Sequence, residues 1–287
     1  MANYRLFVKG LKQIVQIVDD NSTEYLVKDG MNRIKILNDP ENGLAILVDS
    51  DGKFAYVGDV EEAEKRLENG GNVKMVETSG AIAIPGFVDG HSHPVFAGDR
   101  VHEFAMKLAG ATYMEVQEAG GGIMFTTNAT REASEQQLRD DFEQVAMKML
   151  KSGTTTLEAK SGYGLNKDAE MKMLRVLAAE NPRIPLEISA TFCGAHAVPK
   201  GSTESEQTRM ICDELIPAIV AEKKSGGMRN LENIDVFCEK GVFEIESSQK
   251  ILENGKAAGM AVNFHAEELK YIGGVEMGAK IGVSLVS

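Results

Sequence analysis

Hydrophobic residues follow two different patterns along the chain, and the change between them falls near residue 80. Before that point the apolar residues form short runs rich in β-branched and aromatic side chains, such as YRLFVKGL and LAILVDSDGKFAYVG. Asp51 and Gly52 interrupt the second run, and this pair favours the positive φ angles of a tight hairpin turn. We therefore expect residues 1–80 to form a small β-rich domain resembling a β-sandwich.

From residue 81 onward, apolar runs alternate with segments that have the spacing of amphipathic helices. The runs expected to form strands are AIAIPGFVDG, TTTLEA, LEISATFC, IDVFCE, AVNFHAE and GVSLVS. Helix starts are indicated by Ser134 with Gln137, by Asn166 and by Thr203 with Glu206. Another helix is expected to begin at Ser247, and Pro217 is expected to kink or split the helix in which it lies.

Repeated strand–helix units with right-handed crossovers lead to an open, doubly wound sheet or to a closed (β/α) barrel. Polar residues that can carry chemistry follow the ends of several predicted strands: His91 and His93, Tyr163, His196 and Glu268. Barrel enzymes build their active sites from the ends of many strands, whereas an open sheet concentrates its site at one switch point. This distribution favours an α/β protein with a TIM-like (β/α)8 barrel over residues 81–287.

Charge and cysteine content narrow the class of protein. The formal net charge of −12 argues against a nucleic-acid partner and against binding to an anionic membrane. Three cysteines without a CxxC pair indicate no disulfide framework and favour a reducing compartment. The N-terminus lacks the features of a signal peptide, and no apolar stretch is long enough to span a bilayer. These features predict a cytoplasmic protein.

Three histidines have the arrangement of a metal site. Side chains two apart in a strand point to the same side, so His91 and His93 can aim both imidazoles at one point. Alone, this pair is equally compatible with two polar residues in a turn. His265 follows a later apolar run, however, and three imidazoles match the ligand number of a catalytic zinc site with an open position. We therefore predict a metal ion bound by His91, His93 and His265.

The segments IPGFVDGHSHPVFAGDR, KSGYGL, CGAHAVP, DVFCEKGVF and NFHAEE resemble the successive motifs of the imidazolonepropionase family, within the amidohydrolase superfamily. The PGFVDGHSH element marks only the superfamily, whereas the other motifs are narrower and follow in the family's order across nearly the whole chain. The resemblance implies an amidohydrolase-type barrel and one Zn²⁺ or Fe ion. It also implies hydrolysis of the cyclic amide of 4-imidazolone-5-propanoate to N-formimidoyl-L-glutamate, in histidine catabolism.

The same resemblance implies roles for four further residues. Arg100 would bind the propanoate carboxylate through its guanidinium fork, and Tyr163 would offer its hydroxyl to the substrate. His196 would contact the imidazolone ring or the tetrahedral centre, as a substrate-binding and catalytic residue. Glu268 would contact the substrate and handle a proton. Taken singly, these residues also fit ordinary structural roles, such as an acid at a helix N-terminus for Glu268.

Several charged or polar residues receive no catalytic role from the sequence. His102 lies outside every motif, and we expect it to cap or pack. Glu239 ends a predicted strand and can point into the site, but its role stays open. Lys160 and Lys240 follow strands, yet neither lies where the carbamylated lysine of a two-metal amidohydrolase is expected. One ion is therefore favoured over two.

The resemblance covers about two thirds of a family member. In the family, the strand matching GVSLVS continues into a His-containing segment and two more strand–helix units, the last of which supplies a metal-binding Asp. A barrel without its last strands has two unpaired sheet edges. We therefore expect the barrel over residues 81–287 to be incomplete, and this chain alone to bind metal weakly, to aggregate or unfold readily, and to have little activity.

Two other functions stay open. An amidohydrolase-superfamily deaminase acting on a purine or pyrimidine would share the paired histidines, but would leave FAGDR and SGYGL without a carboxylate to bind. A truncated homologue without activity could instead act as a binding partner of the full-length enzyme. The sequence is also compatible with a homodimer, and it does not distinguish zinc from iron.

Overall fold

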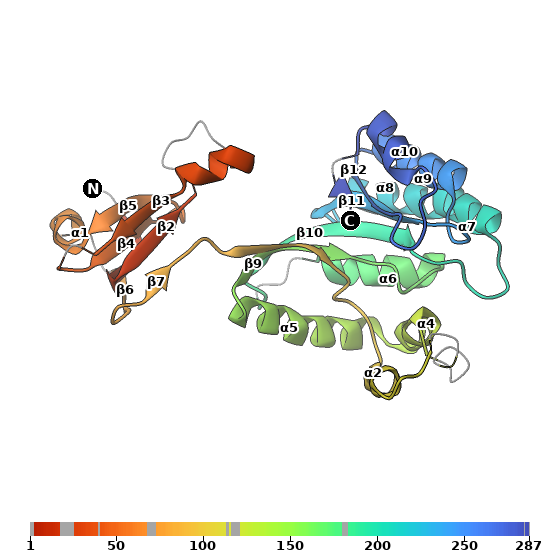
Figure 1. Ribbon diagram of the computed structural model, residues 1–287, viewed down its shortest axis with the longest axis horizontal. Coiled ribbons are helices and arrows are strands. Elements are labelled where there is room, and N and C mark those ends of the chain that lie inside the picture. Colours follow the sequence, from red (N-terminus) through yellow and green to blue (C-terminus); the bar gives the residue numbers. More distant parts are fainter. Residues whose placement is uncertain are drawn as a thin grey trace. The chain divides into compact units, whose positions relative to one another are not determined.

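The computed structural model describes residues 3–17, 26–39, 41–67, 73–112, 115, 121–179, 183–283 and 285–286 (Figure 1). Contacts between residues divide the chain into two compact units, which comprise residues 1–86 and residues 87–287. Among the described residues, no helix is both long enough and apolar enough to cross a membrane.

The first unit contains two small sheets. The four-stranded sheet runs in the order β5 (Phe54–Asp59), β4 (Leu44–Asp49), β1 (Tyr4–Leu11) and β6 (Lys74–Glu77). The three-stranded sheet runs in the order β3 (Lys35–Asn38), β2 (Gln13–Gln16) and β7 (Ile82–Ala83). The short 3-10 helix η1 (Lys28–Arg33) precedes β3, and α1 (Val60–Leu67) follows β5.

Two features hold the four-stranded sheet together. The expected hairpin is confirmed, because β4 and β5 pair antiparallel and Gly52 between them has a φ of +84°. On one face of the sheet, Phe7, Ala45 and Leu47 are fully buried together with Ala63 of α1. The small size of this cluster matches the limited apolar content of this part of the chain.

The second unit is built on a curved sheet of six parallel strands, which confirms the predicted α/β class as a half-barrel. In sheet order the strands are β13 (Leu285–Val286), β12 (Ala261–Ala266), β11 (Leu231–Cys238), β10 (Glu187–Ala195), β9 (Thr154–Lys160) and β8 (Phe87–Ser92). Each strand therefore neighbours the next one along the chain, as in a (β/α) barrel.

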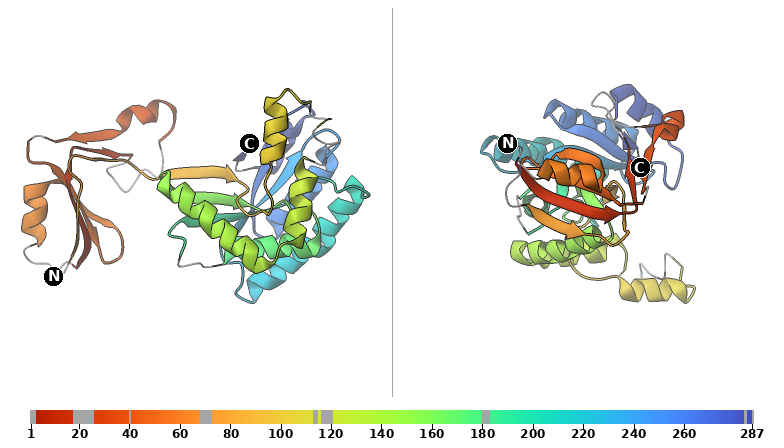
Figure 2. Two further views of the ribbon diagram at one scale, coloured as in Figure 1. Left: turned by 90° about the horizontal axis from the view of Figure 1, so that it is seen from below. Right: turned by 90° about the vertical axis from the view of Figure 1, so that its left-hand side faces the viewer.

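Helices connect these strands and cover the sheet. They are α2 (Val101–Leu108), α4 (Ile123–Glu132), α5 (Glu135–Lys151), α6 (Lys167–Ala178), α7 (Glu204–Met210), α8 (Ile216–Lys224), α9 (Ile245–Ala257) and α10 (Gly274–Ile281). α5 packs against β9, α6 against β10, and α9 against β11 and β12. Figure 2 shows α4 meeting the long α5 at a sharp angle before β9 begins.

Most helix boundaries follow the expected signals. Ser134 and Asn166 cap α5 and α6 through their side chains, and Thr203 forms a capping box with Glu206 at the start of α7. Pro217 acts as expected, because a π-helical turn over Ile211–Leu215 separates α7 from α8.

Two predicted boundaries are wrong. AIAIPGFVDG was expected as one strand, but it forms β7 in the first unit and β8 in the second. Pro85 and Gly86 separate them, since proline cannot donate a hydrogen bond to a ladder. The helix expected to begin at Ser247 begins at Ile245 instead, with Glu244 at its N-cap.

The second unit holds the main hydrophobic core, where helix side chains pack on the sheet. Phe192, Phe243 and Phe264 are among its largest fully buried side chains. All three cysteines of the chain, Cys193, Cys212 and Cys238, lie buried in this unit as free thiols. The core fixes β8 to β12 in register, and the ends of these strands carry the candidate site.

Candidate metal centre

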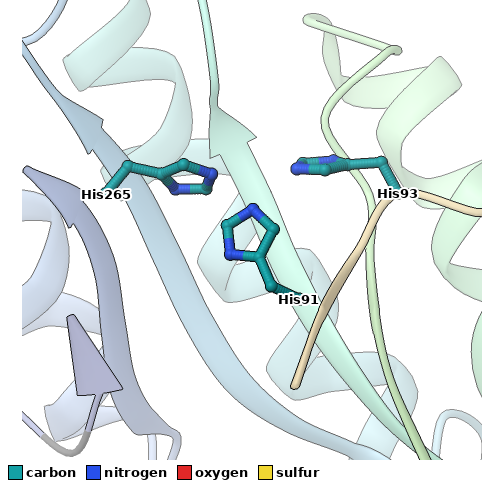
Figure 3. Close-up of side chains that lie close together, drawn as sticks. All are labelled: His91, His93 and His265. Carbon is teal, nitrogen blue, oxygen red and sulfur yellow. The ribbon is translucent and has the colours of Figure 1, made fainter. Parts of the chain in front are cut away.

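Two strands from opposite sides of the half-barrel bring three histidines together. His91 lies in β8, His93 directly follows it, and His265 lies in β12. Figure 3 shows the three rings turned toward one shared space. One ring nitrogen of each lies within 4.8 Å of those of the other two, and the His91 and His265 ring centroids are 4.4 Å apart. Small ring rotations can close such a set around one ion.

Hydrogen bonds select the nitrogens that face this space. The Nδ1 atom of His93 lies 2.8 Å from the carbonyl oxygen of Ser161, and that of His265 lies 2.7 Å from Oδ1 of Asp235. Because a carbonyl or a carboxylate only accepts, each Nδ1 carries the proton and each Nε2 keeps a lone pair. The Nε2 atom of His93 is buried without a hydrogen-bond partner in the described chain. A bound metal ion would give this nitrogen a partner, so the three histidines fit the predicted metal ion.

Burial also keeps two of these histidines, His91 and His93, neutral. It holds the pKa of His93 well below the ordinary value of 6.5 and lowers that of the more exposed His91. Neutral imidazole is the form that binds a metal ion, so both rings are ready ligands near neutral pH.

His196 and Tyr163 lie beside the three histidines. The His196 ring stacks on His93, with centroids 4.4 Å apart and planes 9° apart, and its Nδ1 donates to the Gly162 carbonyl over 2.9 Å. Burial lowers the pKa of His196 to about 4. The Tyr163 ring centroid is 5.6 Å from that of His93. The structure thus brings both residues to the candidate site.

Arg100 lies just before α2, where its guanidinium pairs with Glu103. Its Nε atom is 2.6 Å from Oε2 of Glu103, and its Nη2 donates to Oε1 of the same carboxylate. Burial raises the pKa of Tyr163, and the positive charge of Arg100 opposes that rise. The two side chains are therefore close enough to interact electrostatically. Sequence reasoning missed Glu103, which is buried and also accepts from the Gly122 amide.

Glu268 is exposed and has no hydrogen bond to another described residue. The segment around it is nevertheless held in place. Glu239, whose role the sequence left open, is buried and accepts from the backbone amides of Leu269 and Lys270, over 2.8 and 3.1 Å. Glu239 therefore supports the loop that carries Glu268.

A second carboxyl group supports the loop that carries Tyr163. Glu170 is fully buried, and its Oε1 accepts from the amides of Gly164 and Leu165 over 2.7 and 2.9 Å. The carbonyls that hold His93 and His196 belong to the same loop, at Ser161 and Gly162. One short segment therefore orients two of the site's imidazoles.

A buried polar network lies next to His265, and sequence reasoning missed it. Lys160 of β9 is 2.6 Å from Glu158 and 2.7 Å from Asp235 of β11. Burial alone would raise the pKa of Asp235, but His265 and Lys160 lower it to about 2. The signal available in the sequence was charge within apolar strand runs, with Glu158 and Lys160 two apart on one face of β9.

Cys193, Asp235 and His265 form a second group whose possible ligand atoms lie within 4.8 Å of one another. Two features disfavour it as a cation site. Burial raises the pKa of the Cys193 thiol well above its ordinary value, so the thiolate that binds metal is scarce. The ammonium of Lys160 already contacts Asp235. The three-histidine group is the better candidate.

No protein-family model matches the chain. It is 45% identical over 283 residues to a probable imidazolonepropionase from Nematostella vectensis, an alignment that covers 98% of this chain and 66% of that protein. The corresponding protein from Danio rerio is 46% identical over 285 residues, with 99% and 64% covered. The chain thus spans slightly less than two thirds of the length of these relatives.

Solved structures that resemble the chain show its fold. A guanine deaminase from C. acetobutylicum with bound guanine superimposes with a TM-score of 0.53 at 15% identity, covering 92% of this chain and 53% of that one. An atrazine chlorohydrolase from Arthrobacter aurescens, complexed with zinc and atraton, superimposes with a TM-score of 0.50 at 13% identity. The match covers 97% of this chain and 56% of that one.

Proposed function

This chain is a homologue of the imidazolonepropionases, and from that premise we propose that it carries the metal centre of a cyclic-amide hydrolase. The proposed substrate is 4-imidazolone-5-propanoate, and the product is N-formimidoyl-L-glutamate. The buried Nε2 of His93 carries the proposal, because it has no hydrogen-bond partner among the described residues and shares its space with His91 and His265.

The proposed ligands are His91, His93 and His265, and they would hold one Zn²⁺ or Fe ion. Such an ion, when bound, polarises a carbonyl and lowers the pKa of water toward neutrality. The zinc in the atrazine chlorohydrolase of similar fold supports testing zinc first. The fixed Nδ1 protons of His93 and His265 support this assignment, since the second ring nitrogen of a metal-binding histidine usually has such a partner.

Four residues of the chain would bind and orient the substrate. Arg100 and Tyr163 are proposed to bind the propanoate carboxylate, since the charge of Arg100 reaches Tyr163 and a guanidinium suits a carboxylate. Arg100 would then exchange part of its pairing with Glu103 for the substrate.

His196 is proposed to contact the imidazolone ring through Nε2, because its Nδ1 is engaged with Gly162. Glu268 is proposed to accept a proton from the attacking water and return it to the leaving nitrogen. The exposure of Glu268 leaves it free to do so. In this reaction a water oxygen bonds to the amide carbon, the carbon–nitrogen bond breaks, and the nitrogen takes up a proton.

Zinc-loaded chain should consume imidazolone propanoate and form N-formimidoyl-L-glutamate, as followed by absorbance and mass spectrometry. His91→Ala should weaken zinc binding and ring opening together. Release of ammonia without ring opening would instead support the deaminase alternative. The expectation that this chain binds metal weakly and has little activity stays a prediction, which the same assay measures.

A further inference from the structure

Asp235 connects His265 to a buried lysine through its two carboxylate oxygens. Oδ1 lies 2.7 Å from Nδ1 of His265, and Oδ2 lies 2.7 Å from Nζ of Lys160. Because each oxygen has a different partner, the carboxylate cannot rotate without breaking one of these two contacts. The side chains of Lys160 and Asp235 are both completely buried, so water cannot replace either contact.

Lys160 is itself fixed from a second side. Its Nζ also donates to Oε1 of Glu158 over 2.6 Å, and that oxygen accepts from Thr191 and Asn263 over 2.5 and 3.1 Å. A buried ammonium is retained only where its partners hold it well, because transfer of a charge out of water is unfavourable. Residues from β9, β10, β11 and β12 therefore form one connected network.

The charges in this network are unequal. Two carboxylates, Glu158 and Asp235, surround the single ammonium of Lys160, so the group has an excess of one negative charge when both acids are ionised. His265 lies between this excess and the space shared by the three histidines. A cation in that space would be attracted by the remaining charge, and this attraction would grow without Lys160, so weaker zinc binding in its absence would come from the loss of geometry.

We propose that Lys160 is a positioning residue of the metal centre, which holds Asp235 so that His265 keeps its proton on Nδ1 and presents Nε2 to the ion. The inference rests on the proposed function only in assigning a metal to that space. Lys160 touches neither the three-histidine space nor a substrate, and it acts through Asp235 and His265.

A purely structural role for Lys160 predicts a different result. If the lysine only stabilised the sheet, its replacement would lower the free energy of unfolding and leave the His265 tautomer unchanged. A positioning role also changes which ring nitrogen carries the proton, and it weakens zinc binding in molecules that remain folded. The tautomer is therefore the readout that separates the two roles.

The test compares the 287-residue chain with its Lys160→Met variant, both labelled with ¹⁵N-histidine and free of metal. With five histidines, the ring signals can be assigned by single His→Gln substitutions. In the parent, His265 should give the signals of one Nδ1-protonated tautomer, and in the variant a mixture with the Nε2-protonated form. The zinc dissociation constant, from competition with a chromophoric chelator, should rise about 10–100-fold.

Lys172→Met is the matched control. Lys172 is partly buried and donates to three carbonyls at the end of α4, at Thr130, Arg131 and Ala133. Its replacement should lower stability without changing the His265 tautomer or the zinc dissociation constant. If Lys160→Met does not fold, Asp235→Asn provides the test, because it keeps the shape of the side chain and should disturb the same tautomer.

A folded Lys160→Met chain with a single Nδ1-protonated His265 and an unchanged zinc dissociation constant would overturn the inference. So would an Asp235→Asn chain with both properties unchanged. If the tautomer and zinc binding respond as expected but neither parent nor variant opens the imidazolone ring, the positioning role stands and the proposed substrate is wrong.

Discussion

Strands β8 and β12 contribute the same kind of ligand from very different surroundings. Among the described strands, β8 forms the edge of the six-stranded sheet beside β9, and Val88 within it is 70% exposed. β12 lies between β11 and β13, and its Phe264 is completely buried. His91 is exposed, whereas His265 is buried.

The polar support of the two histidines differs in the same way. His265 has its ring fixed by the buried carboxylate of Asp235. The backbone amide of His91 donates to Oδ1 of Asp89 over 3.2 Å, and within the described residues its ring has no hydrogen-bond partner. The comparison predicts that β12 would set the position of the candidate metal centre in advance and that His91 would adjust to it.

The largest expected difference concerns stability. Phe264→Ala should lower the free energy of unfolding by about 3–5 kcal/mol, because it leaves a cavity in the core beneath β12. Phe87→Ala on the exposed β8 should cost about 1 kcal/mol or less. Urea unfolding of both variants measures the difference. Equal losses would mean that β8 is as well packed as β12.

Zinc binding should differ next. His265→Ala removes the proposed ligand that is already oriented, and it leaves Oδ1 of the buried Asp235 without its imidazole donor. We expect its zinc dissociation constant to rise roughly tenfold more than that of His91→Ala. Chelator competition gives both values. A larger loss for His91→Ala would reverse the assignment of the two strands.

Proton uptake should distinguish buried from exposed imidazoles. The pKa of His196 is lowered from 6.5 to about 4, so between these values the unfolded chain binds more protons than the folded one. The stability contributed by neutral His196 is complete above pH 6.5 and is lost as the pH falls toward 4. Unfolding at pH 7, 6 and 5 should show a flatter pH dependence in His196→Gln than in His91→Gln. An equal pH dependence of the free energy of unfolding in the two variants would contradict the difference in burial between His196 and His91.

The smallest effect is expected at Asp89. This half-buried residue accepts from the His91 amide and from the Ser92 hydroxyl, each over 3.2 Å. Asp89→Ala should lower stability by about 0.5 kcal/mol and change the zinc dissociation constant about twofold or less. Asp235→Ala, by contrast, should weaken zinc binding about 10–100-fold. Calorimetric titration with zinc compares the two variants.

Features that depend on local sequence were predicted well. The Asp51–Gly52 turn and the caps at Ser134, Asn166 and Thr203 all follow from residues close together in the chain. The meeting of His265 with the β8 histidines was also predictable, because strand ends converge at one rim.

Features that depend on register between distant strands were not predicted. Asp235 and Lys160 are 75 positions apart, and their contact follows from the way β9, β10 and β11 align. The sequence marks both as charges in apolar runs but does not give their partner. The pairing of Arg100 with Glu103 was missed for a different reason. The two residues are three positions apart at the start of a short helix, but the substrate-binding role implied for Arg100 by the family resemblance drew attention away from this spacing.

The three buried thiols can report local unfolding of the second unit. Cys193 lies in β10, Cys212 in the π-helical turn and Cys238 at the end of β11, and residues 1–86 contain no cysteine. A thiol reagent can reach these sulfurs only when the surrounding structure separates. The rate of labelling in native buffer therefore reports fluctuations of the half-barrel alone, and mass spectrometry can assign them to three separate places.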